Sequence, residues 1–247
     1  MFSIVIPAHN ESGNIIPLIN EITQVLAARA DAFEIVVVDD GSTDATAAEV
    51  LSAGRPDVRL LRHAAPGGQS AAIHSGVVAA RFPIICTLDG DGQNPPEHIP
   101  ELLAPFAASG SSDLGLVAGQ RVGRKDTLSR RLASQFANGV RGWALNDQTR
   151  DSGCGLKAFR RDAFLALPYF NHMHRYLPAL FAGHGWRVQH VEVTHRPRGA
   201  GRSHYSNLQR GLVGVVDIFG VMWLLRRRKR VAAPQERDIT REPVQDA

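Results

Sequence analysis

Residues 34–46 read EIVVVDDGSTDAT, a β-branched run that ends on two aspartates and a glycine. A continuous run of this kind is typical of a strand buried on both faces in a parallel sheet. Residues 2–6 form a similar run, and residues 14–30 between the two carry Ile and Leu at helical spacing. Together these segments predict a βαβ unit, in which a helix connects two parallel strands.

The same alternation of strand and helix continues along the chain. We expect further strands over residues 58–61, 84–88 and 114–119, and helices over residues 43–53, 69–80 and 95–106. Weaker patterns predict a basic helix over 124–145, strands over 155–159 and 186–194, helices over 160–167, 176–184 and 208–225, and a loop over 197–201. This order predicts an α/β protein with a doubly wound, mostly parallel sheet and helices on both faces.

Composition limits the function classes. The chain has 247 residues, of which 44% are hydrophobic, enough to bury one substantial core. Two widely spaced cysteines, Cys86 and Cys154, predict neither a zinc site nor a disulfide framework, which favours a reducing cytosol. The first residues lack the pattern of a secretory signal. Basic residues are not interleaved with aromatic ones, so nucleic-acid binding is not expected.

Polar groups follow three of the predicted strands, where a doubly wound sheet binds its ligands. They lie in residues 7–11 (PAHNE), 39–42 (DDGS) and 89–93 (DGDGQ). The first two segments could equally be turns or helix caps. In the third, Asp89 and Asp91 would repel each other unless a cation is shared. Their oxygens, with that of Gln93, suit Mg²⁺ or Mn²⁺ bridging to substrate phosphates, and a polar turn is the alternative reading.

Five motifs in order make the chain similar to family-2 inverting glycosyltransferases. They are IVIPAHNE (4–11), EIVVVDDGSTDAT (34–46), LDGDGQNPPE (88–97), DSGCGLKAFRR (151–161) and HRPRGAGRSHY (195–205). The resemblance spans about residues 2–225 and is strongest to the polyprenol-phosphate sugar transferases, the dolichol-phosphate mannose synthase-like subgroup. It implies a GT-A fold over residues 1–206 and an enzyme that uses Mg²⁺ or Mn²⁺. The reaction it implies is transfer, with inversion, from a nucleotide-diphospho-sugar of the GDP-mannose or UDP-glucose type to undecaprenyl or dolichyl phosphate.

The resemblance also implies roles for individual residues. Metal-binding positions are matched by Asp89, Asp91 and Gln93. Positions that contact the nucleotide-sugar are matched by Pro7, Ala8, Asn10, Glu11, Val38, Asp40, Gly90, Ser203 and His204. The catalytic positions, which stabilise the diphosphate or the acceptor phosphate, are matched by Asp89, Asp91, Arg121, Arg131 and Arg202. His204 stands where the family's phosphate-clamping loop usually has Lys, so a side chain that is charged only when protonated replaces one that is always charged.

The acid–base chemistry bears on the acceptor. A sugar hydroxyl needs a carboxylate base to remove its proton, whereas a lipid phosphate is already ionised. Residues 151–155 lack the acidic pair of hydroxyl-acceptor relatives, which favours the phosphate. Asp151 remains an alternative base or a loop anchor, and Cys154 is expected to pack. Two other functions stay open: transfer to a glycan or protein hydroxyl, and a non-catalytic nucleotide-binding membrane module.

Residues 207–230 predict an amphipathic helix that ends in five basic residues. Its apolar face is expected to carry Leu212, Val215, Phe219, Met222 and Trp223, with Arg210 and Asp217 opposite. Residues 211–225 would span about 22 Å as a helix, short of a hydrocarbon core of about 30 Å. The pattern suits the interface of an anionic membrane and equally a helix docked on the domain. We expect a cytoplasmic protein, peripheral on the inner face of the plasma membrane, or a homo-oligomer pooling weak anchors, with a disordered tail over 231–247.

Overall fold

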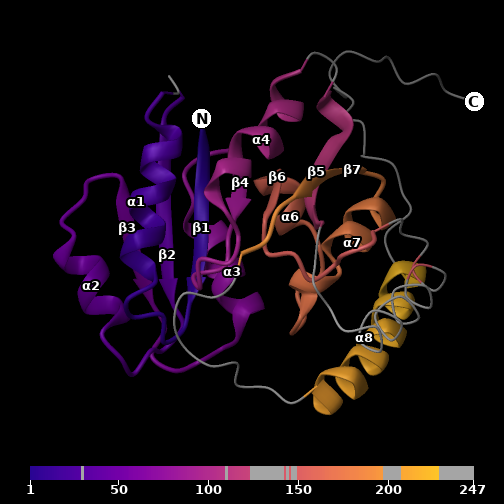
Figure 1. The fold of residues 1–247 in the computed structure, drawn as a ribbon. Helices are drawn as coiled ribbons and strands as arrows, with labels where there is room; N and C mark the ends of the chain where they lie inside the picture. Colours follow the sequence, from indigo (N-terminus) through magenta and orange to yellow (C-terminus); the bar gives the residue numbers. More distant parts are fainter. Residues whose placement is uncertain are drawn as a thin grey trace, which may run out of the picture.

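The computed structural model describes residues 1–28, 31–108, 111–122, 142, 145, 149–196 and 207–227. In this part of the chain a seven-stranded sheet has the order β3-β2-β1-β4-β6-β5-β7 (Figure 1). Its strands are β1 (Phe2–Ala8), β2 (Phe33–Asp39), β3 (Val58–Arg62), β4 (Ile84–Thr87), β5 (Leu114–Arg121), β6 (Lys157–Arg160) and β7 (Arg187–Val193). Neighbouring strands are parallel except where β6 pairs with β4 and β5. The predicted α/β class and mostly parallel sheet are confirmed.

The helices follow the predicted order with shifted ends. They are α1 (Ile15–Leu26), α2 (Thr46–Ser52), α3 (Gln69–Ala79), α4 (Ile99–Ala107), α6 (Arg161–Leu165), α7 (Leu177–Gly183) and α8 (Asn207–Arg227), with short 3₁₀ turns η1 (Pro96–His98), η2 (Ser111–Asp113) and η3 (Met173–Arg175). Helix α2 begins three residues later than predicted, because the Asp44 carboxylate accepts hydrogen bonds from the backbone N–H and hydroxyl of Thr46. The predicted basic helix, apart from residues 142 and 145, and the predicted 197–201 loop and C-terminal tail lie outside the described residues.

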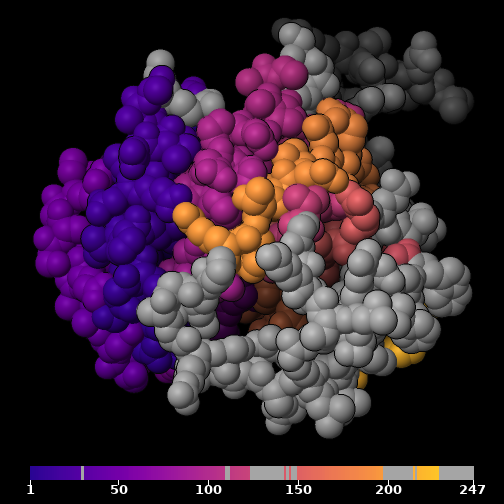
Figure 2. Space-filling view, in the orientation of Figure 1, coloured from indigo at the N-terminus to yellow at the C-terminus, as the bar shows by residue number. Residues whose placement is uncertain are grey.

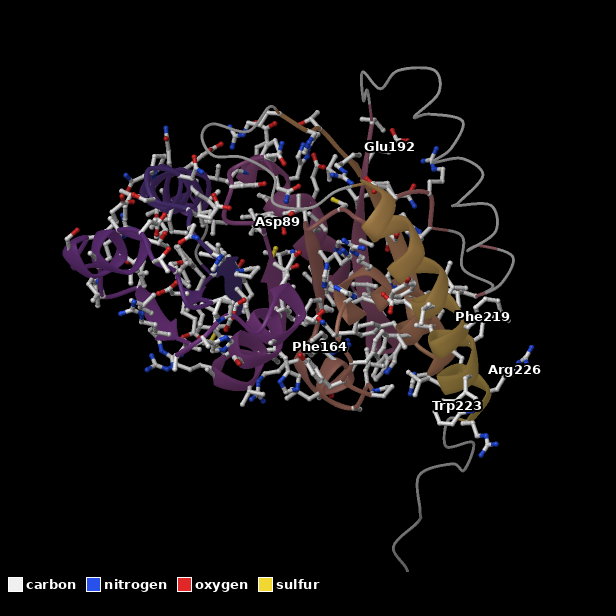
Figure 3. The ribbon with its side chains drawn as sticks, turned by 90° about the horizontal axis from the view of Figure 1, so that it is seen from below. Asp89, Phe164, Glu192, Phe219, Trp223 and Arg226 are labelled. Carbon is white, nitrogen blue, oxygen red and sulfur yellow. The ribbon has the colours of Figure 1, made fainter. Side chains whose placement is uncertain are left out.

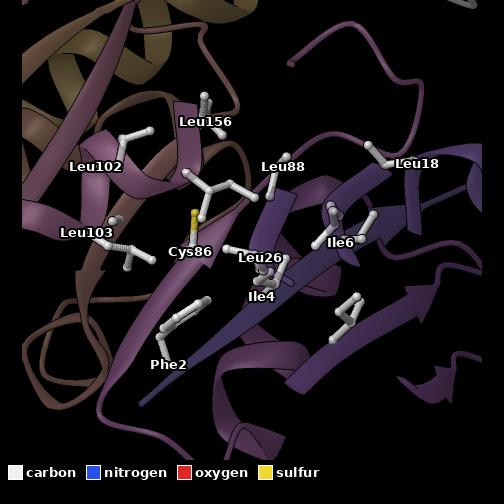
Figure 4. Close-up of a cluster of buried hydrophobic side chains, with 14 of the residues drawn as sticks. Phe2, Ile4, Ile6, Leu18, Leu26, Cys86, Leu88, Leu102, Leu103 and Leu156 are labelled. Carbon is white, nitrogen blue, oxygen red and sulfur yellow. The ribbon is translucent and has the colours of Figure 1, made fainter. Parts of the chain in front are cut away.

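Two clusters of apolar side chains pack on opposite faces of the sheet. Alternate residues of β1 divide between them: Ile4 and Ile6 join the cluster that includes α1 and α4 (Figure 4), whereas Val5 joins the one that includes α3 and α7. Strand β2 divides in the same way, with Val37 in the first cluster and Val38 in the second. Burial on both faces explains why these strands read as unbroken hydrophobic runs.

Strand β1 extends through Pro7 to Ala8, two residues beyond the predicted end at residue 6. Pro7 has no N–H to donate, yet it fits here because β4 ends at Thr87, which pairs with Val5. On the other side of β1, the Ala8 carbonyl accepts from the N–H of Asp40 at 2.8 Å. The ends of β1, β2 and β4 therefore lie side by side, as predicted.

Helix α8 packs against the domain through a different face from the predicted one. Val221 is fully buried, and Ile218, Met222 and Leu225 pack against the second core cluster. Val216, Phe219 and Trp223 are 71%, 67% and 57% exposed, so the expectation that Phe219 and Trp223 share a face with Met222 is wrong. The docked side chains recur at three- and four-residue spacing, which leaves a second apolar stripe turned outward. Asp217, expected opposite the apolar face, lies toward the domain, with its carboxylate 3.2 Å from the His172 ring.

Candidate functional site

The acidic loop after β4 lies against the end of β1. A Cβ added at Gly90 would be 3.0 Å from the Pro7 carbonyl oxygen and 3.4 Å from the Cβ of Ala8, so a side chain there would crowd the strand. Figure 3 shows Asp89 between the N-terminal and C-terminal halves of the fold. Pro7, Ala8 and Gly90, which the resemblance assigns to the nucleotide-sugar, thereby lie side by side at the acidic loop.

The Asp89 carboxylate is held in one position by two side-chain amides. Gln69, the first residue of α3, donates to Oδ1 at 2.7 Å, and buried Asn94 donates to Oδ2 at 3.0 Å. A Cβ at Gly155 would lie only 2.2 Å from Oδ2, so glycine makes the room that the carboxylate occupies. Neither amide was assigned from the sequence, because Gln69 is twenty residues away along the chain and Asn94 looks like part of a turn.

Electrostatics favours a cation beside this loop. Burial raises the pKa of Asp89 above its ordinary value, and the nearby charge of Asp91 raises it further. The N–H of Gln93 donates to Asp91 Oδ1 at 3.1 Å, which turns the loop around the second acid. A cation bound between the two acids would relieve their repulsion.

The residues present fit a hard divalent ion. Among the described residues no three His, Cys, Asp or Glu side chains gather closely enough to hold a metal alone. Two carboxylates with further oxygens from water and substrate phosphates are a donor set that suits Mg²⁺ and Mn²⁺. Asp89 and Asp91 would hold the ion, and Gln93 lies in the same loop.

Arg121 and Asp151 form a paired group at the end of β5. Nε and Nη2 of the arginine donate to the two carboxylate oxygens at 2.5 and 2.8 Å. Burial acts to lower the pKa of Arg121, but the hydrogen bonds and charge of Asp151 outweigh it and raise that pKa. Asp151 therefore has both oxygens engaged by a permanent cation, which disfavours it as a general base.

Lys157 is a buried cation that the sequence reading did not single out. It is 3% exposed in β6, and its ammonium group donates to the carbonyl of Cys154. Burial lowers the pKa of Lys157, whereas the charges of Asp89 and Asp151 act in the opposite direction. A lysine within an otherwise apolar strand segment, GLKAF, is the signal that could have identified it. Cys154 is itself buried, with a raised thiol pKa caused by burial, so its expected packing role is confirmed.

The first two polar loops are joined to each other by hydrogen bonds. Asn10, at φ 56°, receives a bond from the Thr43 N–H on its Oδ1 and donates its own N–H to the Ser42 hydroxyl, both at 2.9 Å. The Glu11 N–H donates to the Thr46 hydroxyl at 2.9 Å. These contacts fix the two loops as one unit beside the acidic loop.

Asp40 connects the second loop to the segment before α3. Its carboxylate accepts from the N–H groups of Gly67 and Gly68 at 2.8 and 2.7 Å and lies 2.7 Å from Nδ1 of His63. Burial acts to raise the pKa of Asp40, but these contacts outweigh it and hold the pKa below its ordinary value. Val38 is fully buried in the second core cluster, so its side chain is not exposed to a ligand. Arg131, Arg202, Ser203 and His204, also predicted as site residues, lie outside the described residues.

Comparison with solved structures defines the fold class. Glucosyl-3-phosphoglycerate synthase from Mycobacterium tuberculosis, in complex with Mn²⁺, UDP-glucose and phosphoglyceric acid, superimposes with a TM-score of 0.68 at 19% identity, over 93% of this chain and 81% of that one. The expected GT-A fold is confirmed.

Sequence comparison identifies the family. The chain belongs to glycosyl transferase family 2, whose model matches residues 3–167. Dodecaprenyl-phosphate galacturonate synthase of Rhizobium johnstonii is 33% identical over 234 residues, which cover 92% of this chain and 68% of that protein. Undecaprenyl-phosphate 4-deoxy-4-formamido-L-arabinose transferase of Yersinia pestis is 35% identical over 211 residues, which cover 83% of this chain and 62% of that protein. The chain thus spans about two thirds of the length of these relatives.

Proposed function

We propose that the protein transfers a sugar, with inversion and with a divalent cation, from a nucleotide-diphospho-sugar to a polyprenyl phosphate. The observation that carries the proposal is how three acids are hydrogen-bonded: Asp89 and Asp91 after β4, and Asp151 beside the end of β5. Asp89 is fixed by two amides beside Asp91, whereas Asp151 is engaged by Arg121. This arrangement supports the binding of a cation and a diphosphate, and the pairing with Arg121 leaves Asp151 poorly suited to activate a hydroxyl.

The chemistry requires little proton transfer. An oxygen of the acceptor phosphate forms a bond to the anomeric carbon on one face, while the bond to the donor diphosphate breaks on the other. The nucleoside diphosphate leaves with the electron pair of the broken bond. A bound Mg²⁺ or Mn²⁺ supplies charge stabilisation for that leaving group. Asp89 and Asp91 would hold the ion, and Arg121, whose guanidinium is fixed by Asp151, would add positive charge near the diphosphate.

The relatives support the acceptor class, since both are named for a polyprenyl phosphate. Their names also widen the range of sugars beyond mannose and glucose to a uronic acid and a modified arabinose. The structural neighbour binds Mn²⁺ together with UDP-glucose, which makes uridine nucleotides and Mn²⁺ the first ligands to test.

The outer face of α8 supports approach to a lipid surface. Val216, Phe219 and Trp223 form an exposed apolar stripe, and Arg226 and Arg227 follow it in the last turn of the helix. Figure 3 shows Phe219, Trp223 and Arg226 along this part of α8. The guanidinium of Arg227 lies 5.5 Å from the centre of the Trp223 ring. Among the described residues, no helix has the length and apolar character needed to cross a bilayer. We propose that the stripe rests in the interface of an anionic cytoplasmic leaflet, where each basic residue contributes about 1 kcal/mol.

A transfer assay tests the proposal directly. UDP-sugars and GDP-sugars with a radiolabelled sugar are incubated with Mn²⁺ and undecaprenyl phosphate, and the organic phase is counted. Label that enters the organic phase only when the cation is present is the expected result. Label that instead enters a glycan or protein acceptor would establish the hydroxyl-acceptor alternative. No transfer with any acceptor, together with nucleotide binding in a thermal-shift assay, would favour the non-catalytic module.

A further inference from the structure

Arg196, three residues beyond β7, holds the acidic loop by hydrogen bonds from its outer side. Its Nε donates to the carbonyl of Gly92 at 2.8 Å, and its backbone N–H donates to the carbonyl of Gln93 at 3.2 Å. Its Nη2 lies 2.6 Å from the carboxylate of Glu21 on α1. In Figure 2 the segment that ends at Arg196 is orange and crosses the surface toward the indigo N-terminal part. One side chain thus contacts both the acidic loop, 104 positions before it in sequence, and helix α1, where Glu21 lies 175 positions before it.

The two carbonyls that Arg196 engages follow directly after Asp91. Gly92 has φ +70°, and a Cβ built there would meet nothing within 4 Å, so side-chain packing does not define this turn. Hydrogen bonds hold it instead: the N–H of Gln93 donates to Asp91 Oδ1 within the loop, and Arg196 donates to the carbonyls of Gly92 and Gln93 from outside it. Toward the core, Gln69 and Asn94 donate hydrogen bonds to Asp89, so the loop is held by hydrogen bonds on both sides.

The backbone that leads into Arg196 has an anchor of its own. The N–H of Thr194 donates to Nε2 of His98 at 3.0 Å, and the Thr194 hydroxyl lies 2.9 Å from the same nitrogen. Changing the Arg196 side chain therefore removes the bonds to Gly92 and Glu21 while this anchor remains. That separation allows the contacts of the Arg196 side chain to be tested without displacing the end of β7.

We propose that Arg196, oriented by Glu21, is a positioning residue that sets the turn after Asp91 and thereby the affinity of the acidic pair for a divalent cation. A charged donor is well suited to the task, because its bonds to a carbonyl and a carboxylate are stronger than neutral ones. The part of this proposal that concerns cation affinity rests on the proposed function, whereas the part that concerns the conformation of the loop does not. Groups that orient a metal ligand typically change metal affinity by about 10- to 100-fold when removed.

The test compares Arg196→Gln with three other variants. Arg196→Lys keeps the charge but loses the two-pronged guanidinium, and Glu21→Gln removes only the negative charge of the partner that orients it. Arg187→Gln is the matched control, because Arg187 at the other end of β7 also pairs with a carboxylate, that of Asp113 at 3.0 and 3.1 Å. Hydrogen exchange of the peptide covering residues 89–94 is measured without metal. Mn²⁺ binding in the presence of UDP is measured by electron paramagnetic resonance of the free ion.

Arg196→Gln is expected to speed exchange in that peptide and to weaken Mn²⁺ binding about 10-fold. Arg196→Lys and Glu21→Gln should fall between it and the wild type, and Arg187→Gln should match the wild type. Unchanged exchange and unchanged Mn²⁺ affinity in Arg196→Gln would overturn the proposal. If the wild type binds no Mn²⁺, the proposed function fails, and hydrogen exchange then decides the positioning role alone. Should Arg196→Gln not fold, Arg196→Lys and Glu21→Gln give the same two readouts.

Discussion

Replacing Gly155 by alanine tests whether the position of Asp89 matters for the reaction. The added Cβ would lie 2.2 Å from Asp89 Oδ2 and 2.3 Å from both Cγ and Oδ1. The carboxylate must then move by about 1 Å to reach an ordinary contact distance. Such a move would stretch or break the bonds from Gln69 and Asn94, now 2.7 and 3.0 Å long. A misplacement of about 1 Å can lower a catalysed rate about 100-fold.

The measurements are Mn²⁺-dependent transfer to undecaprenyl phosphate, Mn²⁺ affinity and thermal unfolding. Gly155→Ala should lower transfer about 100-fold and weaken Mn²⁺ binding. Overpacking should lower the unfolding free energy by about 1–3 kcal/mol. Gly214→Ala in α8 is the control, since a Cβ there meets nothing within 4 Å. Wild-type transfer and Mn²⁺ affinity in Gly155→Ala would refute the view that Asp89 must occupy its present position.

Three further predictions concern charge, pH and packing. Asp91→Asn should lower Mn²⁺-dependent transfer at least about 100-fold. In metal-free buffer the same change should raise the melting temperature, because it removes a charge that repels Asp89. A lower melting temperature would contradict this repulsion. Asp40→Asn should lower the melting temperature at pH 7. Because the folded-state pKa of Asp40 lies below the ordinary value of an aspartate, the difference in melting temperature between variant and wild type should narrow as the pH falls from that ordinary value through the folded-state pKa. A difference that does not change with pH would argue against this linkage. Phe164→Ala should lower the free energy of unfolding, measured in urea, by about 3–5 kcal/mol, because Phe164 is buried and its ring stacks on that of Phe159 with 4.9 Å between ring centres. A decrease under about 1 kcal/mol would show that this contact is not part of the core.

Local patterns were sufficient for much of the fold. The β-branched runs of β1 and β2 are buried on both faces, so the strands could be recognised without knowing their neighbours. The rule that ligands bind beyond the carboxyl ends of parallel strands then placed residues 7–11, 39–42 and 89–93 at one edge, where the structure has them. The face of α8 was predicted wrongly, because a helix with apolar residues around much of its circumference has more than one stripe that could dock.

The sequence by itself determined the alternation of strands and helices, the acidic pair after β4 and the absence of a second acidic pair at residues 151–155. These features depend on residue type and on near neighbours along the chain. Only the tertiary structure decided which partners those residues have. Gln69 reaches Asp89, Arg121 engages Asp151, and Arg196 joins the acidic loop to Glu21. Such pairs are separated by 20 to 175 positions, and the order and register of the strands, which local propensity does not specify, bring them into contact.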